Sequence, residues 1–337
     1  MPVSPGLARG AARLVAGRPP MIGAYDADII ILSFNRLAET QAAIRSALAQ
    51  RGGVFHVTVL DQGSEPEILQ ILVRMFSKTE DFALYAATTN LGVAGGRNLA
   101  TSLGHGQIIV ALDNDAIFNG KWVVSRAHRS FIQAPDLGAL AFGILGADGV
   151  HCDRFSWGYP ARLAARFKER FDTTTFVGAG HAIRRVTWNA VGGYDPAFFF
   201  TWEEYDFCLA AIALNWRIAY DGTLSVIHNI SADARVNWSA ERMTYFVRNR
   251  LTISRKWGAS WIGLVPRILG YLLKAWVNGC IDAAMLGIRE AWSIKLPRQR
   301  KMSKAMRNYL YRNEVRHRGS WLGRLRTEVF GRLGLEN

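Results

Sequence analysis

The chain has 337 residues, of which 50% are hydrophobic and 20% are charged, a composition that supports a folded core and excludes wholesale disorder. Its three cysteines, Cys152, Cys208 and Cys280, lie far apart, so neither a disulfide framework nor a zinc finger is expected. Lysine and arginine number 41 against 27 aspartate and glutamate, and the formal net charge of +14 indicates an anionic partner such as nucleic acid, a phosphorylated ligand or anionic lipid.

Short apolar runs alternate with helix-like segments through the first half of the chain. Strands are expected at residues 28–32, 54–60, 82–86 and 107–112, with helices at residues 37–50 and 68–76 and a third helix opening in the loop at residues 90–98. Strands that alternate with helices form parallel, doubly wound sheets, which bind ligands beyond the carboxyl ends of their strands. Polar clusters lie at three of these ends, at residues 33–36, 61–64 and 113–115.

The second half of the chain has a less regular pattern. Strands are expected at residues 137–145, 176–184 and 218–227, and a helix at residues 202–214. Beyond residue 235 the pattern becomes helical and amphipathic.

The C-terminal region combines apolar and basic character. Residues 291–337 contain twelve Lys or Arg and three Glu, a net charge of +9. The most apolar stretch, residues 261–288, is interrupted by Pro266, Arg267, Lys274 and Asp282, so no membrane-spanning helix is expected. Such a region can lie in a membrane interface facing anionic lipids, or it can pack on the rest of the chain or on a second subunit. We expect a cytoplasmic protein, peripheral on the inner face of the bacterial plasma membrane.

Asp113 and Asp115 stand two residues apart at the end of an expected strand. Side chains at positions i and i+2 of extended backbone share one face. Both carboxylates could therefore address one divalent cation together with a ribose or a diphosphate. The alternative is an Asp-Asn-Asp turn that caps the next helix.

An acidic cluster, Glu203, Glu204 and Asp206, follows the aromatic run at residues 198–202. A carboxylate in partly apolar surroundings can have a raised pKa and act as a general base. Acids at a helix start also interact favourably with the helix dipole. Further on, His228 follows an apolar strand, where it could bind a metal, donate to phosphate or serve as a structural histidine.

The glycine-rich loop before Arg97 does not fit a known phosphate-binding signature. Gly92, Gly95 and Gly96 do not match G-x-G-x-x-G, and no G-K-[ST] follows. These glycines could still let the backbone approach a nucleotide. Arg97 could reach a phosphate, or it could be a solvated charge at a helix start.

In their order along the chain, these clusters resemble the inverting family 2 glycosyltransferases with a GT-A fold, in particular the rhamnosyltransferase-like branch that builds bacterial surface polysaccharides. The matching motifs are I-I-L-S-F-N-R (30–36), V-L-D-Q-G-S (59–64), N-L-G-V-A-G-G-R-N (90–98), L-D-N-D-A (112–116), G-A-G-H-A-I-R-R (178–185), V-G-G-Y-D-P-A-F-F-F (191–200), W-E-E-Y-D-F (202–207), I-H-N (227–229) and Y-F-V-R-N-R (245–250). Any one of these motifs is weak evidence, but nine in the family's order are strong.

The resemblance implies an α/β, GT-A (Rossmann-like) catalytic domain with a mostly parallel sheet and a C-terminal amphipathic helical extension. We expect a mobile N-terminal extension at residues 1–25, the catalytic domain at residues 26–240 and a helical basic region at residues 241–337. Within the catalytic domain, the nucleotide half would end near residue 116 and the acceptor half would follow.

The resemblance also assigns roles to individual residues. Asp113 and Asp115 would be the family's D-x-D motif and, with His228, would bind Mg²⁺ or Mn²⁺, with Asp115 the more direct ligand. Asp206 would be a supporting residue near the sugar, and the acceptor side would include Trp157, His181 and Trp202. The residues around the nucleotide sugar would be Ser33, Asn35, Arg36, Asp61, Asn90, Arg97, Asp113, Asn114 and Asp115.

The implied reaction is a single in-line displacement with inversion at the anomeric carbon. Glu204 occupies the position of the family's base, where most members carry Asp, and Glu203 could compete for that role. The donor would be a nucleotide diphosphate sugar, with dTDP or UDP favoured. The acceptor would be a glycan or a lipid-linked glycan. Anionic membrane and a second copy of the chain are further expected partners.

Two other functions fit parts of the sequence less well. A nucleotidyltransferase that makes nucleotide sugars would carry a Gly-rich, basic signature near the first strand, where this chain has Ser33-Phe34-Asn35-Arg36. A nucleic-acid-binding protein is suggested by charge alone, and no recognised module accompanies that charge. Nucleic acid is therefore not expected as a partner.

Overall fold

The computed structural model describes residues 12–228, 240–296 and 300–319. In this part of the chain a ten-stranded sheet has the order β1-β4-β3-β2-β5-β9-β7-β10-β6, and β8 pairs with β10 outside this path. The strands are β1 (Ala12–Gly17), β2 (Ala27–Ser33), β3 (Phe55–Asp61), β4 (Phe82–Ala87), β5 (Ile108–Asp113), β6 (Ala116–Phe118), β7 (Leu137–Leu145), β8 (Arg170–Asp172), β9 (Gly180–Arg184) and β10 (Arg217–His228).

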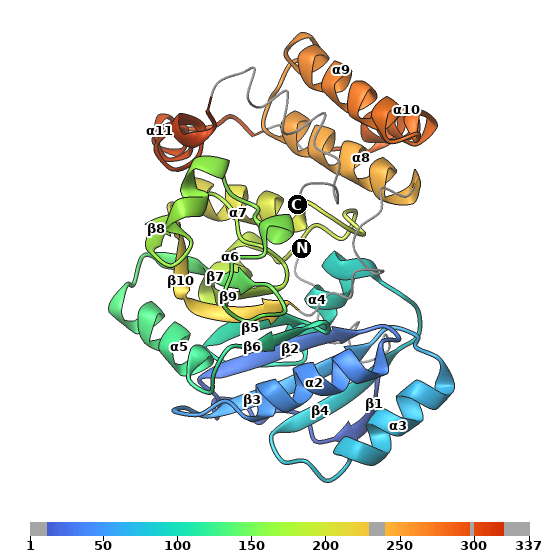
Figure 1. The fold of residues 1–337 in the computed structure, drawn as a ribbon, viewed down its shortest axis with the longest axis vertical. Helices are drawn as coiled ribbons and strands as arrows, with labels where there is room; N and C mark the ends of the chain where they lie inside the picture. The colour runs from blue at the N-terminus through green and yellow to red at the C-terminus, as the bar shows by residue number, and fades with distance from the viewer. Residues whose placement is uncertain (1–11, 229–239, 297–299, 320–337) are drawn as a thin grey trace.

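Helices cover both faces of this sheet (Figure 1). They are α2 (Leu37–Leu48), α3 (Pro66–Phe76), α4 (Gly92–Ser102), α5 (Val123–Gln133), α6 (Arg185–Val191), α7 (Glu203–Ala213), α8 (Ala240–Lys256), α9 (Trp261–Val277), α10 (Ile281–Ser293) and α11 (Lys304–Asn313). Short 3₁₀ turns lie at Arg154–Ser156, Ala161–Arg166 and Val315–His317.

The central part of the sheet is parallel, because β2 pairs in parallel with both β3 and β5, and β3 does so with β4. Each of these strands is rich in apolar residues and is buried on both faces, as is typical of parallel strands, although Asp28, His56 and Thr58 are buried among them. β9 then inserts antiparallel between β5 and β7. The expected α/β fold with a mostly parallel central sheet and C-terminal helices is confirmed.

Alternation along the strands divides the core between the two faces of the sheet. Ile29 and Ile31 pack with residues of α2, α3 and α5, whereas Ile30 packs with residues of α4, α6 and α7. Successive side chains of a strand point to opposite faces, which produces this division. The second of these clusters also includes Trp257 just after α8 and Met306 of α11, so the C-terminal helices are joined to the core on this face of the sheet.

Two expected boundaries differ from the structure. Residues 12–17, part of the expected mobile extension, form β1 and pair antiparallel with β4 at the edge of the sheet. The pairing satisfies the edge of β4, which no other described strand covers. The strand expected at residues 176–184 is shorter and begins at Gly180.

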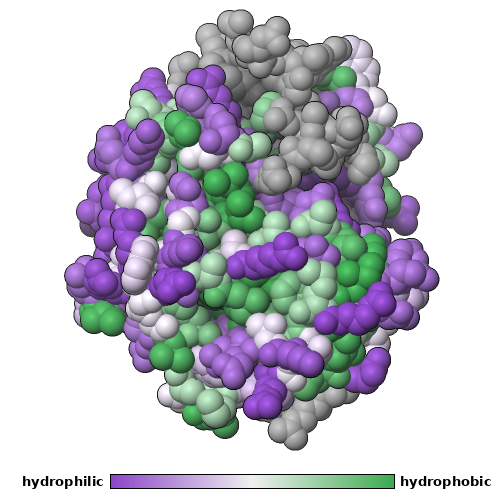
Figure 2. All heavy atoms as spheres, turned by 60° about the horizontal axis from the view of Figure 1, so that its bottom comes forward, coloured by the Kyte–Doolittle hydropathy of each residue, from purple (hydrophilic) through white to green (hydrophobic). Residues whose placement is uncertain are grey.

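Helices α8, α9 and α10 form a separate layer at one end of the molecule, away from α2 and α3 (Figure 1). They enclose a third apolar cluster centred on Met243, Val247 and Leu251 of α8. Among the described residues, no helix has the length and apolar character needed to cross a membrane. At the opposite end of the molecule, hydrophilic and hydrophobic side chains are interspersed over the surface (Figure 2).

Candidate active site

The carboxyl ends of β2, β3 and β5 meet at one edge of the sheet. Ser33 pairs with Asp61 across β2 and β3, and Leu32 pairs with Asp113 across β2 and β5. The three polar clusters that follow these strands are therefore neighbours, which is the arrangement expected from the sequence.

The loop after β2 has an unusual backbone. Asn35 and Arg36 both have left-handed conformations, with φ of 56° and 51°. Asn35 is held by its neighbours, because its side-chain oxygen accepts from Glu65 N at 3.0 Å and its backbone N–H donates to the Ser64 hydroxyl at 2.7 Å. Left-handed residues other than glycine are uncommon, and from this backbone the Arg36 guanidinium contacts the Asp115 carboxylate.

The Asp61 carboxylate forms its hydrogen bonds within its own loop. Asp61 is 1% exposed, and its carboxylate accepts from the amides of Gly63 and Ser64 at 3.1 and 3.0 Å and from the Ser64 hydroxyl. Nearby Ser33 has a buried hydroxyl without a hydrogen-bond partner among the described residues. A buried hydroxyl without a partner is costly, which makes Ser33 a candidate for contact with a bound molecule.

Gln62 was not singled out from the sequence, although it joins two loops of the site. Its side-chain oxygen accepts from Leu91 N at 3.0 Å, and its amide nitrogen donates to Gly92 O at 3.3 Å. Asn90 supports the same turn by accepting from Gly92 N at 2.8 Å. A lone glutamine in a turn has no distinctive sequence pattern, so only the structure identifies this role.

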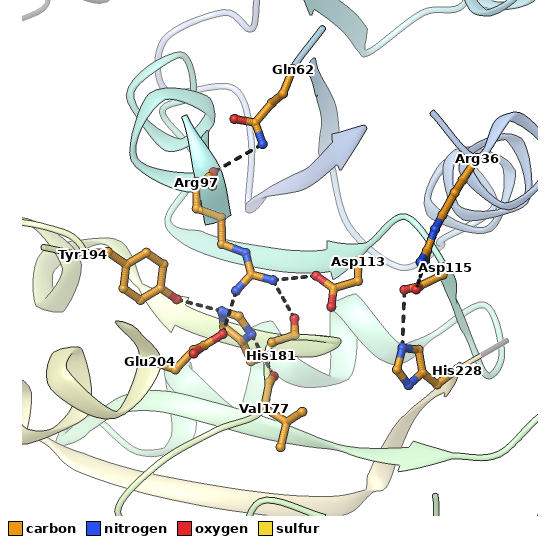
Figure 3. A network of polar contacts seen from close by, with 12 residues as sticks. Arg36, Gln62, Arg97, Asp113, Asp115, Val177, His181, Tyr194, Glu204 and His228 are labelled. Carbon is orange, nitrogen blue, oxygen red and sulfur yellow. Dashed lines mark hydrogen bonds and ion pairs between the residues drawn. The ribbon is translucent and has the colours of Figure 1, made fainter. Parts of the chain in front are cut away.

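Arg97 of α4 is the centre of the site (Figure 3). It is 2% exposed and donates to Asp113 Oδ1 at 2.7 Å, to Gly178 O at 2.8 Å and to Glu204 Oε1 at 3.2 Å. A buried guanidinium requires paired acids and several acceptors. Arg97 thus connects the end of β5 to the start of α7, and it is no solvated helix-start charge.

The acids at the start of α7 follow two more left-handed residues, Thr201 and Trp202, with φ of 68° and 71°. Glu203 is 2% exposed, and its Oε2 has no hydrogen-bond partner among the described residues. The side chain of Glu204 is 15% exposed and faces Arg97. Glu204 therefore has the better access to a bound substrate.

Burial changes the proton affinity of both acids. It raises the pKa of Glu203 well above the usual range, and the neighbouring Glu204 charge raises it further. Burial also raises the pKa of Glu204, but the Arg97 charge opposes that rise. The structure thus favours a neutral Glu203 beside a Glu204 that ionises more readily.

We expect Glu203→Gln to stabilise the protein at alkaline pH. A carboxyl whose folded pKa is raised contributes stability below the ordinary glutamate pKa, and that contribution is lost as the pH rises toward the folded value. Glutamine has a similar shape and no charge to bury. Thermal denaturation should give a melting temperature about 2–4 °C above the parent at pH 8 and a smaller difference at pH 5. An equal difference at both pH values would contradict the raised pKa of Glu203.

Asp206, expected near the sugar, is engaged elsewhere. Its carboxylate accepts from Lys256 Nζ at 2.8 Å, and the same ammonium contacts Asp195. Burial raises the pKa of Asp206, while Lys256 opposes the rise. This ion pair links α7 to α8, which makes Asp206 a positioning residue in this structure.

Asn249 of α8 holds the strained turn before the acids. It is completely buried, and its side-chain nitrogen donates to Phe200 O at 2.8 Å and to Thr201 O at 2.9 Å. These carbonyls belong to the first left-handed residue, Thr201, and to the residue before it, so α8 holds the backbone that presents Glu204. The sequence indicated this only as the motif at residues 245–250.

Replacing Asn249 with Ala should destabilise the protein by about 1–3 kcal/mol, because two partly buried carbonyls lose their donor. Denaturant unfolding monitored by circular dichroism measures the loss. Asn308→Ala, at an exposed position of α11, is the matched control and should change stability by less than about 0.5 kcal/mol. Equal effects of the two substitutions would show that the Asn249 bonds contribute nothing.

Asp115 and His228 form a second polar group on the other side of Asp113 (Figure 3). Asp115 Oδ1 and His228 Nε2 are 3.4 Å apart, and His228 Nδ1 lies 3.3 Å from Asp153 Oδ2. Burial alone would lower the pKa of His228, but the bonds to Asp115 and Asp153 outweigh it and raise the pKa to about 9. Burial would raise the pKa of Asp115, and His228 and Arg36 hold it below its usual value.

The three expected metal ligands do not converge in this structure. Asp113 is turned to Arg97, whereas Asp115 and His228 lie together. Within the described residues, no group of three or more His, Cys, Asp or Glu side chains is arranged to hold a metal. Asn114, which lies between Asp113 and Asp115, donates to Thr40 Oγ1 at 3.1 Å and so supports the turn that follows β5.

The three aromatic residues expected on the acceptor side differ in position. His181 is 1% exposed and contacts Val177 O and the Tyr194 hydroxyl through its two ring nitrogens, so it supports the site from beneath and does not face an acceptor. Trp202 is half-buried against Tyr205 and Phe246. The Trp157 ring packs on Tyr159 and Tyr220.

The chain is similar to known proteins in sequence and in fold. Residues 28–187 match the model of Glycosyl transferase family 2. An uncharacterized protein of Haemophilus influenzae is 27% identical over 168 residues, which cover 49% of this chain and 90% of that protein.

Two solved structures share the fold at low sequence identity. Mannosyltransferase PcManGT from Pyrobaculum calidifontis, in complex with GDP-Man and Mn²⁺, has a TM-score of 0.55 at 15% identity, covering 93% of this chain and 86% of that chain. GalNAc-T7, with UDP, GalNAc and Mn²⁺, has a TM-score of 0.60 at 10% identity, covering 91% of this chain and 58% of that chain.

Proposed function

We propose that this glycosyltransferase, whose residues 28–187 match the model of Glycosyl transferase family 2, moves a sugar from a nucleotide diphosphate donor to a hydroxyl of a glycan or lipid-linked glycan. A dTDP- or UDP-sugar is the favoured donor, and bacterial surface-polysaccharide synthesis by the rhamnosyltransferase-like branch is the favoured setting. The observation that carries the proposal is the buried Arg97, which contacts both Asp113 and Glu204. The acid at the nucleotide edge and the candidate base thereby belong to one site.

The nucleotide would bind at the carboxyl edge of the central strands. The buried hydroxyl of Ser33 supports this, because it has no partner among the described residues. Asn35, Arg36, Asp61, Asn90 and Asn114 shape the surrounding loops. Arg36 adds a positive charge for a diphosphate, which suits a guanidinium.

The side chains present fit a divalent cation. Asp115 offers a carboxylate oxygen and His228 a ring nitrogen 3.4 Å from it, and Mg²⁺ or Mn²⁺ is commonly held by one or two carboxylates together with substrate phosphates. Because the pKa of His228 is raised to about 9, this ring would release its proton on binding the cation. The related structures solved with Mn²⁺ support the same requirement. When bound, the cation would neutralise charge that develops on the diphosphate leaving group.

Glu204 would act as the base. Its carboxylate takes the proton of the acceptor hydroxyl, the acceptor oxygen forms a bond to the anomeric carbon, and the bond from that carbon to the diphosphate oxygen breaks. A single displacement inverts the configuration, and no covalent intermediate is formed. Arg97 orients Glu204 and favours its ionised form, as a base at neutral pH requires.

Thermal-shift titration of the full chain with UDP, dTDP and GDP, with and without Mn²⁺, tests this proposal, and GMP is the control. A ligand at 100 times its Kd stabilises the native state by about 2.7 kcal/mol. We expect one diphosphate to raise the melting temperature only when Mn²⁺ is present, and GMP to have no effect. The absence of a shift with every diphosphate would contradict the donor site.

A further inference from the structure

The outward face of α9 is apolar along its whole length. Trp261 and Trp276 are each 68% exposed, and Ile262, Val265 and Leu269 are exposed as well. At 3.6 residues per turn these five side chains fall within about 100° of the helix circumference. They are called the α9 face below.

The charged residues of α9 point the other way. Arg267 donates to the Ser254 hydroxyl of α8 at 2.6 Å, and the Lys274 ammonium lies 5.4 Å from the centre of the Phe246 ring. A helix on a water-exposed surface normally turns its apolar side inward and its charges outward. In α9 the charged side chains face the protein and two tryptophans face outward, which is the reverse of this arrangement. The α9 face is therefore expected to contact an apolar or interfacial surface.

Helix α10, which packs beside α9, continues the pattern. Met285 and Trp292 are 50% and 41% exposed. Arg289 lies at positions i+4 and i−3 from them, on the same side of the helix, and is exposed too. Apolar side chains therefore share the outer surface of α10 with one basic residue, Arg289, and with the exposed acid Asp282.

The net positive charge of the chain comes entirely from residues 240–337, the C-terminal part that contains α9 and α10. Residues 1–239 contain equal numbers of acidic and basic side chains, whereas residues 240–337 carry the whole excess of +14. Exposed basic side chains in the described part of that region include Arg289, Lys295, Arg300, Lys301, Lys304 and Arg307. A second copy of the chain would bring the same positive charge and repel it, whereas an anionic surface complements it.

We propose that the α9 face docks onto an anionic lipid bilayer, with its tryptophans in the interfacial layer and Arg289 of the neighbouring α10 on the lipid headgroups. Tryptophan is favoured at this depth, and basic residues near anionic lipid add to the attraction. Because no described helix can cross a membrane, the contact lies in the plane of the interface. It is independent of sugar transfer, although it would bring a lipid-linked acceptor toward the site.

Vesicle flotation of the full chain, without donor, tests the docking surface. The two vesicle types are phosphatidylcholine alone and phosphatidylcholine with phosphatidylglycerol. We expect binding to the anionic vesicles, weaker binding to the neutral ones, and a decrease at high salt. Trp261→Ser with Trp276→Ser should weaken binding about tenfold or more. Trp122→Ser, at a site 56% exposed near α5, is the matched control and should leave binding within about twofold.

Other outcomes overturn the proposal. Binding that is equal in the double variant and in the parent would show that the α9 face is not used. If the parent does not bind anionic vesicles, the proposed membrane docking is wrong. If light scattering finds a dimer that the double variant loses, the face is an interface between copies. Thermal melting of the double variant should match the parent, since these side chains are exposed, and this comparison identifies any folding defect.

Discussion

Glu204→Gln is expected to lower kcat by about 10²–10⁴-fold, the contribution of a well-placed general base, while donor binding stays close to that of the parent. Glutamine retains the shape of the side chain and can still contact Arg97, but it cannot take the acceptor proton. Single-turnover transfer measures the loss, and nucleotide binding by thermal shift measures the retained site. Turnover close to the parent would exclude Glu204 as the base.

Glu203→Gln is the matched control for this experiment, because it makes the same change one residue away. Glu203 is buried, and its raised pKa favours the neutral form, so its removal as an acid should leave most of the activity. If Glu203→Gln loses activity and Glu204→Gln retains it, the two roles are exchanged.

The pH profile of the parent provides an independent check of the base. Activity requires the Glu204 carboxylate, so the rate falls as the pH falls through its pKa. Because burial raises that pKa above the ordinary value of 4.5, the acidic limb should lie above pH 4.5. Since the two acids are adjacent, the apparent value belongs to the pair.

Asp115→Ala is expected to abolish the Mn²⁺-dependent thermal shift and with it transfer, while the protein still folds. Its carboxylate contacts Arg36 and His228, so the substitution removes the side chain around which the candidate cation site is built. A loss of about 10²-fold or more in kcat/KM is expected where a cation ligand is deleted. The measurements are transfer and the diphosphate titration, each with and without Mn²⁺.

Asp136→Ala is the matched control for Asp115. Asp136 is an exposed acid immediately before β7, at the edge of the sheet opposite the site. The substitution removes its ion pair with Arg217 and should leave the metal-dependent shift unchanged. A metal-dependent shift that persists in Asp115→Ala would contradict the assignment of Asp115.

The strand pattern shows how much of this fold was predictable. Buried runs such as Ile29–Ile31 could be predicted because parallel strands are apolar on both faces. The polar residue at each strand end could be predicted because parallel strands end at one edge of the sheet, where ligands bind. β1 was not predicted, since it pairs with the edge strand β4, and β4 is far away in sequence. The insertion of β9 between β5 and β7 likewise depends on pairing between distant segments.

In the candidate site, too, the residues could be identified from the sequence, but their contacts could not. Residue type and order along the chain were enough to single out Arg97, Asp113, Asp115 and Glu204. The sequence could not show that Arg97 contacts Asp113 and Glu204, that Asp206 is paired with Lys256, or that His181 is beneath the site.

By itself, the sequence determined which chemical groups are present, which apolar periods form strands and helices, and where the excess positive charge lies. The tertiary structure decided which of those groups meet, which are buried and which way α9 turns its tryptophans. The physical reason is that periodicity and residue type act over a few neighbouring residues. Burial, ion pairing and the resulting pKa changes depend on segments brought together from distant parts of the chain. Asn249 and Glu204 make the point, because 45 residues of sequence separate them, yet the first holds the turn that presents the second.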